Sequence, residues 1–405
     1  MERQYKDSGV AWASQIPSDW KIIRGKNLLK LMNRPVRETD DVVTCFRDGE
    51  VILRSERRTE GFTMSDKEIG YQGINKGDIV IHGMDGFAGA MGVSKSTGKG
   101  SPVLVVCNPK EDDDSRYIVY YLRTLAMNNV FVALATGIRE RSCDLRWNKI
   151  SDLPFIRPKA DEQKNIADFI DAKIDEIDGL IALQEQMIEK LKAYKQSVIT
   201  EAVTKGLDPN AKLVPSGIDW IGDIPEGWNI IRLKFLCTIQ TGNQDTKDAN
   251  NDGEYPFYVR SPQIEHSHKY TFEGEGILMA GDGAGAGRVF HHAYGKYAVH
   301  QRVYRLANFH DINTNYLFYL ISSTFCKEMD RGSAQSTVPS VRLPMLTNFK
   351  ICIPSEIEQQ AIASYLDSKC SDIDRLIALK QQKIASLKDY KKSVIYEAVT
   401  GKTDI

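Results

Sequence analysis

The chain has 405 residues, of which 42% are apolar and 26% are charged, and its formal net charge at pH 7 is −1. A chain of this length can hold more than one hydrophobic core, and the composition is typical of an ordinary soluble globular protein. No run of residues is long and apolar enough to span a membrane, so no membrane-spanning helix is expected.

The cellular compartment is also indicated by the sequence. The first residues lack the apolar centre of a signal peptide, and the seven cysteines are odd in number and widely scattered. We therefore expect a cytoplasmic protein with reduced, structural thiols. The near-zero net charge neither favours nor excludes nucleic acid, because a balanced chain can still carry a basic face.

The chain opens on a segment that returns in its second half. Residues Ser8–Leu28 read SGVAWASQIPSDWKIIRGKNL, and Ser216–Leu236 read SGIDWIGDIPEGWNIIRLKFL. We call each copy a leading segment. The repeat predicts that the whole protein is duplicated, and we expect the paired Trp and Pro side chains to pack against their own domain.

The region after each leading segment diverges but keeps a common outline. Gly77–Gly92 and Gly274–Phe290 each predict a strand, a glycine-rich turn and a second strand. Short apolar runs follow, and then a helix is predicted in each half. The runs are Val103–Cys107 and Tyr297–Leu306, and the helices are Tyr117–Met127 and Tyr316–Met329. Each globular region is therefore expected to be α+β.

A second repeat closes each half. The stretch Glu162–Gly206 is more than half identical to Glu358–Lys402, and both carry apolar residues at alternating spacings of three and four. This pattern predicts one long helix per copy with a seam close to a heptad. Pro354-Ser355 followed by Glu358 predicts a capping box at the start of the second helix. We expect the core of the helix pair to contain Ile174, Ile177, Ile181, Ile188, Leu191, Ile373, Ile377, Ile384 and Leu387.

These segments define an expected organisation in four parts. They are a first recognition domain at 1–157, a first spacer helix at 158–206, a linker with a second recognition domain at 207–353, and a second spacer helix at 354–405. The second helix can bury its apolar stripe by running antiparallel along the first. We therefore expect an α+β fold of two pseudo-symmetric globular domains separated by a pair of long antiparallel helices.

Motifs for chemistry are weak in this sequence. Gly281–Ala286 fits a dinucleotide fingerprint, but the residues after it predict strand rather than the helix that would hold a pyrophosphate. The histidines His266, His268, His291, His292 and His300 have no first-half counterparts and no pattern of ligands beside them. We predict no catalytic residues, no metal site and no cofactor in this chain.

The divergent regions do carry side chains suited to DNA. Arg and Gln can read base edges, and Lys contacts phosphates, whereas the acidic run Glu111–Asp114 is expected to face away. The candidate DNA-binding residues are Arg34, Arg37, Lys95, Lys99, Arg139, Arg141, Arg146, Lys247, Arg260, Arg288, Arg302, Gln335, Ser336 and Arg342.

The motifs together resemble a known family. The leading segments, the Pro-x-x-x-Glu-Gln-x-x-Ile helix starts (Pro158–Ile166, Pro354–Ile362) and the Glu-Ala-Val-Thr helix ends are similar to those of specificity subunits of type I restriction-modification systems. The resemblance covers essentially the whole chain. It implies a non-catalytic subunit whose two domains each read one half of a bipartite asymmetric site on double-stranded DNA.

The resemblance also implies partners. The helices would set the spacing of the half-sites and dock two methylation subunits, and restriction subunits would join the full complex. S-adenosylmethionine, ATP and Mg would be bound by those partners. One departure lies at Gly137-Ile-Arg-Glu-Arg, which is unlike the turn that Gly332-Ser-Ala-Gln approximates. Two other readings remain, namely a protein-scaffolding subunit that does not read DNA and a nucleotide-using enzyme built on the glycine-rich turns.

Overall fold

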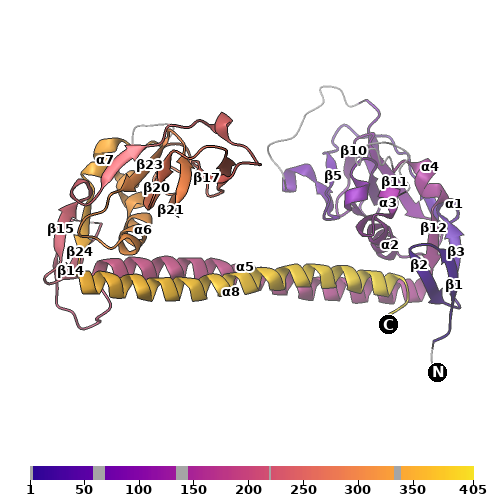
Figure 1. Cartoon of the computed structure of the whole chain (residues 1–405). Helices are drawn as coiled ribbons and strands as arrows, with labels where there is room; N and C mark the ends of the chain where they lie inside the picture. The colour runs from indigo at the N-terminus through magenta and orange to yellow at the C-terminus, as the bar shows by residue number, and fades with distance from the viewer. Residues whose placement is uncertain (1–2, 58–68, 134–144, 219, 333–338) are drawn as a thin grey trace. The chain divides into compact units, whose positions relative to one another are not determined.

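The computed structural model describes residues 3–57, 69–133, 145–218, 220–332 and 339–405. The chain forms two compact units, which we call unit 1 (Met1–Gln184 with Gln382–Ile405) and unit 2 (Glu185–Gln381). Both contain helices and sheets, so the predicted α+β class is confirmed (Figure 1). Within the described part of the chain, no helix combines the length and the apolarity needed to cross a bilayer.

Each unit is built on a four-stranded antiparallel sheet with the same strand order. In unit 1 the order is β4 (Leu29–Leu31), β11 (Leu104–Pro109), β8 (Ile79–His82) and β9 (Met91–Val93). In unit 2 it is β16 (Thr238–Thr241), β23 (Val303–Ala307), β20 (Gly276–Ala280) and β21 (Phe290–Ala293). The duplication read from the leading segments and helices therefore extends through the divergent regions.

Shorter elements surround the two sheets. In unit 1 they are β1 (Tyr5–Val10), β2 (Ala13–Pro17), β3 (Lys21–Arg24), α1 (Gly25–Leu28), β5 (Val43–Cys45), β6 (Val51–Leu53), η1 (Arg54–Glu56), β7 (Gln72–Ile74), η2 (Gly86–Ala88), β10 (Gly98–Gly100), α3 (Val130–Ala133), α4 (Trp147–Asp152) and β12 (Pro154–Arg157). In unit 2 they are β13 (Leu213–Pro215), β14 (Asp223–Pro225), β15 (Asn229–Arg232), η4 (Leu233–Phe235), η5 (Thr246–Asp248), β17 (Tyr255–Tyr258), β18 (Glu265–Ser267), β19 (Phe272–Glu273), β22 (Lys296–Val299), α7 (Leu343–Thr347) and β24 (Lys350–Ile353).

The predicted hairpins and helices of the divergent regions are confirmed. β8 pairs with β9 and β20 with β21 across the glycine-rich turns. The helices are α2 (Ser115–Met127) and α6 (Thr314–Gly332). The apolar run Tyr297–Leu306 falls in two strands, β22 and β23, because the chain turns at His300–Arg302, where the backbone N–H of Val303 donates to the His300 carbonyl at 2.9 Å.

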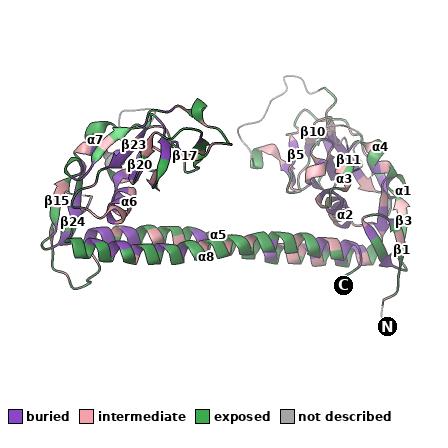
Figure 2. Cartoon of the chain, in the orientation of Figure 1, coloured by how far each residue is buried: buried purple, intermediate pink, exposed green. Residues whose placement is uncertain are grey.

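Two long helices complete the fold. They are α5 (Ala160–Lys205) and α8 (Glu356–Val399), of 46 and 44 residues. In unit 1 the Lys391 ammonium of α8 pairs with Asp178 of α5 at 2.8 Å, and in unit 2 Lys195 of α5 pairs with Asp374 of α8 at 2.7 Å. In each unit the first part of one helix therefore lies against the last part of the other, which is the antiparallel pairing predicted from the repeat. Figure 2 shows buried and exposed positions alternating along both helices.

The helix starts differ as their sequences indicate. At α8 the Ser355 backbone N–H donates to Glu358 Oε2 at 3.1 Å, and the Glu358 N–H donates to Ser355 Oγ at 3.4 Å, so the predicted capping box is confirmed. At α5 the matching carboxylate, Glu162, accepts the indole N–H of Trp20 at 2.8 Å, as Glu358 accepts that of Trp228 at 3.4 Å, but Lys159 stands where Ser355 caps α8.

The leading segments pack against the ends of the long helices. In unit 1 a Cβ at Gly401, just past α8, would stand 2.5 Å from Pro17 and 3.0 Å from Trp20. In unit 2 Gly206, just past α5, lies against Trp228 in the same way. Trp20 is 1% exposed and Trp228 is 8% exposed. Each leading segment packs within its own unit, as predicted, and the helix end that it covers belongs to the other repeat.

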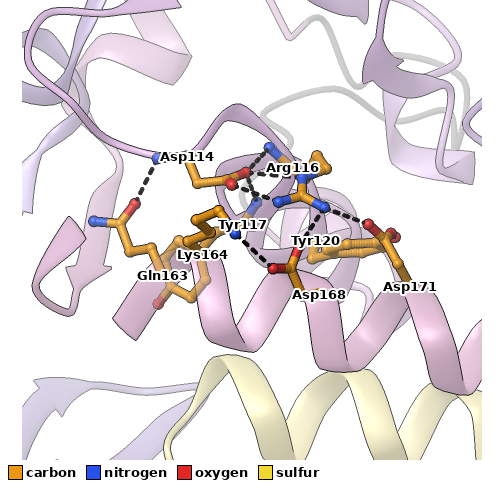
Figure 3. Close-up of polar contacts among 8 residues, drawn as sticks. All are labelled: Asp114, Arg116, Tyr117, Tyr120, Gln163, Lys164, Asp168 and Asp171. Carbon is orange, nitrogen blue, oxygen red and sulfur yellow. Dashed lines mark hydrogen bonds and ion pairs between the residues drawn. The ribbon is translucent and has the colours of Figure 1, made fainter. Parts of the chain in front are cut away.

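A polar joint fastens each globular region to a long helix. In unit 1 Asp114 caps α2 by accepting the N–H of Arg116 at 2.7 Å, and its own N–H donates to Gln163 Oε1 of α5 at 3.0 Å (Figure 3). Arg116 also pairs with Asp168 and Asp171 of α5 at 2.8 and 2.6 Å. The hydrogen bonds to Asp114, and then to Asp168 and Asp171, raise the pKa of Arg116 above its usual value, because they stabilise the charged guanidinium.

Unit 2 contains the same joint in another sequence. The N–H of Asn313, before α6, donates to Gln359 Oε1 of α8 at 2.7 Å, and the Tyr319 hydroxyl donates to Asp367 at 2.8 Å. The joint explains part of the acidic run Glu111–Asp114, because Asp113 and Asp114 are engaged with Arg157, Gln163 and α2. These carboxylates hold the fold together.

Candidate nucleic-acid interface

The second-half candidates converge on the turn between β20 and β21. Asp282 in this turn accepts hydrogen bonds from the guanidinium groups of Arg260, which follows β17, and Arg302, which precedes β23. The N–H of Val341 donates to the Gly281 carbonyl at 2.7 Å and Ser340 bridges to Asp282, which brings the segment before Arg342 to the same place. Three of the predicted arginines therefore come from separate segments that meet at one turn.

The charge at this turn remains positive. Asp282 is half-buried, and burial raises its pKa, but the hydrogen bonds from Arg302 and Arg260 outweigh burial and leave the pKa below its usual value. One carboxylate faces two arginines, so a net positive charge is left at a surface where both guanidinium groups are exposed. Such a surface favours an anionic partner.

Arg34 in the first half is held by the fold. Its guanidinium pairs with Asp78, which is 2% exposed and also accepts hydrogen bonds from the Asn75 N–H at 2.7 Å and the Asn108 amide at 2.9 Å. A buried carboxylate needs such a counter-charge, and removing one partner of a buried pair is strongly destabilising. Arg34 therefore has a structural role, and its contact with DNA stays a prediction.

The other described candidates of the first half lie on loops and short strands. Arg37 is exposed and its N–H donates to Asp40 at 2.8 Å, while the exposed Lys95 pairs with Glu50 at 3.0 Å. Lys99 lies half-buried in β10, and Arg146 is exposed at the N-terminal end of α4. Unlike the arginines around Asp282, these four described residues do not meet at one turn.

The remaining candidates fall into two groups. In unit 2 the side chains of Lys247 in η5, Arg288 in the glycine-rich turn and Arg342 before α7 are exposed. Lys247 also lines a pocket with Lys269. Four candidates lie outside the described residues, namely Arg139, Arg141, Gln335 and Ser336.

The residues predicted for the core of the helix pair are shielded from solvent to different extents, and their packing in a common core stays a prediction. Among them Ile177 is 2% exposed, and the others are buried or half-buried. Leucines on the outer faces are exposed at the same positions of the two repeats: Leu180 and Leu183 on α5, and Leu376 and Leu379 on α8. The helices therefore present apolar side chains that their own unit does not cover.

Sequence reasoning missed three residues of the two turns. Arg47 in the first half was not proposed, yet its guanidinium pairs with Asp85 of the glycine-rich turn at 2.8 Å. Asp85 and Asp282 were also passed over. A signal was present, because the two turns share an Asp-Gly pair, 85–86 and 282–283, although the flanking residues differ.

Other chemistry finds little support at these sites. Neither glycine-rich turn leads into a helix that could hold a phosphate, since β9 and β21 follow them. The histidines of unit 2 make separate hydrogen bonds, His292 to Glu275 at 2.9 Å and His291 to the Ser261 carbonyl at 3.0 Å. Within the described ranges, no group of three or more His, Cys, Asp or Glu is placed to hold a metal ion.

Comparison with known proteins finds similar sequences in one family. Residues 225–389 match the family described as "Type I restriction modification DNA specificity domain". The type I restriction enzyme EcoDI specificity subunit of Escherichia coli is 28% identical over 180 residues, which are 44% of this chain and 39% of that protein. The MjaVIII specificity subunit of Methanocaldococcus jannaschii is 24% identical over 416 residues, covering 96% of this chain and 94% of that protein.

The fold is shared with a solved structure. A chain from a study of the complex assembly and conformational transition of the type I R-M system superposes with a TM-score of 0.72 at 15% identity, covering 96% of this chain and 99% of that one. In sequence and in fold, the chain is therefore similar to specificity subunits of type I restriction-modification systems.

Proposed function

We propose that this chain is the sequence-specific DNA-recognition subunit of a type I restriction-modification complex. The observation that carries the proposal is a shared frame with different surfaces. Both units keep the same sheet order and the same joint to a long helix, while the arginines around their turns differ in number and origin. Equivalent frames with unlike surfaces are suited to reading two different half-sites, since base contacts come from individual side chains.

The helix pair would set the distance between the two DNA half-sites and bind the methylation subunits. α5 would be about 69 Å long at 1.5 Å per residue over its 46 residues, and the exposed leucines of α5 and α8 would bind the methylation subunits. Methyl transfer from S-adenosylmethionine, and DNA cleavage driven by ATP with Mg, would belong to methylation and restriction subunits. Such a complex would act on cellular DNA in the cytoplasm.

Binding to duplex DNA tests the proposal first. The chain co-expressed with a methylation subunit should bind duplex DNA with an affinity that falls steeply with salt, because phosphate contacts release counterions. Sequencing of methylated bases in cells that express the complex should reveal one asymmetric motif in two parts. Binding that ignores DNA sequence, in a complex that assembles normally, would favour the scaffolding alternative.

Exchange of one recognition region tests modularity. Replacing residues 27–151 with the equivalent region of another specificity subunit should change one half of the methylated motif and leave the other half intact. The matched control is the exchange of the second region, which should alter only the opposite half. A change in both halves from either exchange would contradict independent reading.

A further inference from the structure

One glycine of the first turn makes room for an arginine. A Cβ at Gly89 would stand 2.9 Å from the carbonyl oxygen of Arg47, and Gly89 has a φ of +90° that other residues rarely adopt. The Arg47 side chain then reaches Asp85 in the same turn at 2.8 Å and remains 64% exposed. The turn therefore accommodates the backbone of Arg47 and holds its guanidinium.

The second turn does the same for two arginines. A Cβ at Gly285 would stand 2.7 Å from the Arg260 carbonyl, and one at Gly281 would stand 2.8 Å from the Arg302 carbonyl. Both guanidinium groups bond Asp282 through Nη1 and remain 43% and 62% exposed. Here too, glycines admit the arginine backbones and an aspartate holds the side chains.

The two aspartates occupy equivalent positions. Asp85 lies six residues after Ile79, the first residue of β8, and Asp282 lies six residues after Gly276, the first residue of β20. β8 and β20 hold the same place in their sheets. The arginines come from different segments in the two halves. The two units therefore share the turn and its aspartate but differ in the arginines that the aspartate binds.

We infer that the glycine-rich turns position arginine side chains so that their guanidinium groups bind guanine in the DNA. This inference extends the proposed function and rests on it. Arg47 would read the first half-site, and Arg260 and Arg302 the second. Asp85 and Asp282 are positioning residues, which act on DNA only through the arginines they hold.

Guanine is the base that suits these groups. Its O6 and N7 acceptors in the major groove pair with two N–H donors of one arginine. In the second turn each guanidinium bonds Asp282 through Nη1, so the edge formed by Nε and Nη2 faces no carboxylate among the described residues. A charge-assisted bond to a fixed carboxylate restricts the side chain before DNA arrives, which lowers the entropy lost on binding.

Substitution of the positioning residues tests the inference in the assembled complex. Asp282→Asn should lower discrimination against duplexes altered in the second half-site by roughly 5- to 150-fold, the worth of a bidentate base contact, and leave discrimination at the first half-site unchanged. Asp85→Asn should give the opposite pattern. Asp223→Asn removes the same charge from an exposed position in the second leading segment and should change neither.

A second pair of measurements separates positioning from simple support of the fold. Asp282→Asn should have no further effect when Arg260 and Arg302 are both alanine, because the aspartate acts through them. Duplexes with 7-deazaguanine in the second half-site lack the N7 acceptor. They should bind the wild-type complex more weakly than natural duplexes, and bind the double arginine variant equally well.

The outcomes are distinct. The inference that Asp282 positions the arginines would be refuted if Asp282→Asn left discrimination unaltered. It would also be refuted if Asp282→Asn still lowered discrimination when Arg260 and Arg302 are both alanine. If Asp282→Asn weakened binding to all duplexes equally and made it less dependent on salt, the arginines would contact phosphates rather than bases. Each of these results requires a wild-type complex that distinguishes sequences. A wild-type complex without that ability would instead refute the proposed function itself.

Discussion

The hydroxyl of Tyr117 offers a sharp test of how unit 1 is closed. It lies in the core, and its single proton is shared between the Ile156 carbonyl of β12 at 3.0 Å and the Val399 carbonyl of α8 at 3.3 Å. The last carbonyls of a helix have no partner within it, so Tyr117→Phe would leave a buried acceptor without its donor. We expect a loss of about 1–3 kcal/mol in the free energy of unfolding.

Calorimetry and hydrogen exchange can measure this loss. Unit 1 has 208 residues, 184 plus 24, and a domain of that size shifts its Tm by about 2–4 °C per kcal/mol. The Tm of unit 1 should fall by roughly 2–12 °C, with faster amide exchange at the end of α8.

The matched variant is Tyr316→Phe in unit 2. Its hydroxyl bonds the Cys352 carbonyl at 2.9 Å and the Val203 carbonyl of α5 at 3.1 Å, so the faster exchange should appear at the end of α5. If Tyr117→Phe left the Tm unchanged, or loosened both helix ends equally, the hydroxyl would not fasten α8 to unit 1.

Three further predictions concern pH, helix propensity and spacing. Burial lowers the pKa of four histidines below the usual 6.5, so the unfolded state binds more protons than the folded state. The free energy of unfolding should therefore fall as the pH drops below about 6.5, and it should fall more in unit 2, which holds three of the four. A Tm that stayed constant from pH 7.5 to 5.5 would contradict this. The four are His82, His291, His292 and His300. Gly179→Ala should stabilise α5 by about 0.5–1 kcal/mol in denaturant unfolding, since an added Cβ meets nothing within 4 Å, and a loss of stability would show a hidden constraint. Seven residues inserted after Gln186 and after Gln382 would lengthen each helix by about 10 Å in phase, and the methylated half-sites should move apart by about three base pairs at 3.4 Å each; an unchanged spacing in an active complex would refute the helices as the ruler.

Regular features of the fold could be predicted because they leave a period in the sequence. The spacing of Ile177, Ile188 and their repeat partners marks the helices, and the Ser355–Glu358 pair marks a helix start. The hairpins at β8 and β20 follow from apolar runs beside glycine. Each of these signals is local, so comparison of the two halves of one chain was enough to find it.

The site was harder to predict because its contacts join distant residues. Arg47 meets Asp85 across 38 positions, and Arg302 meets Asp282 across 20. An exposed arginine has no period that separates it from an ordinary surface charge. Arg34 illustrates the opposite case, since its partner Asp78 is buried, and nothing near Arg34 in the sequence indicates that pairing.

The division of the units has a consequence for synthesis. Unit 2 is continuous over Glu185–Gln381, whereas unit 1 needs Gln382–Ile405 as well as the first 184 residues. Domains generally fold in the order in which they leave the ribosome, but here the residues up to Gln184 must wait for Gln382–Ile405, which are made after all of unit 2. Until these emerge, Trp20 and Tyr117 lack the end of α8 that covers them. A chain that stops after Gln381 would expose part of the unit 1 core, so premature termination would yield a product open to proteolysis rather than a working half.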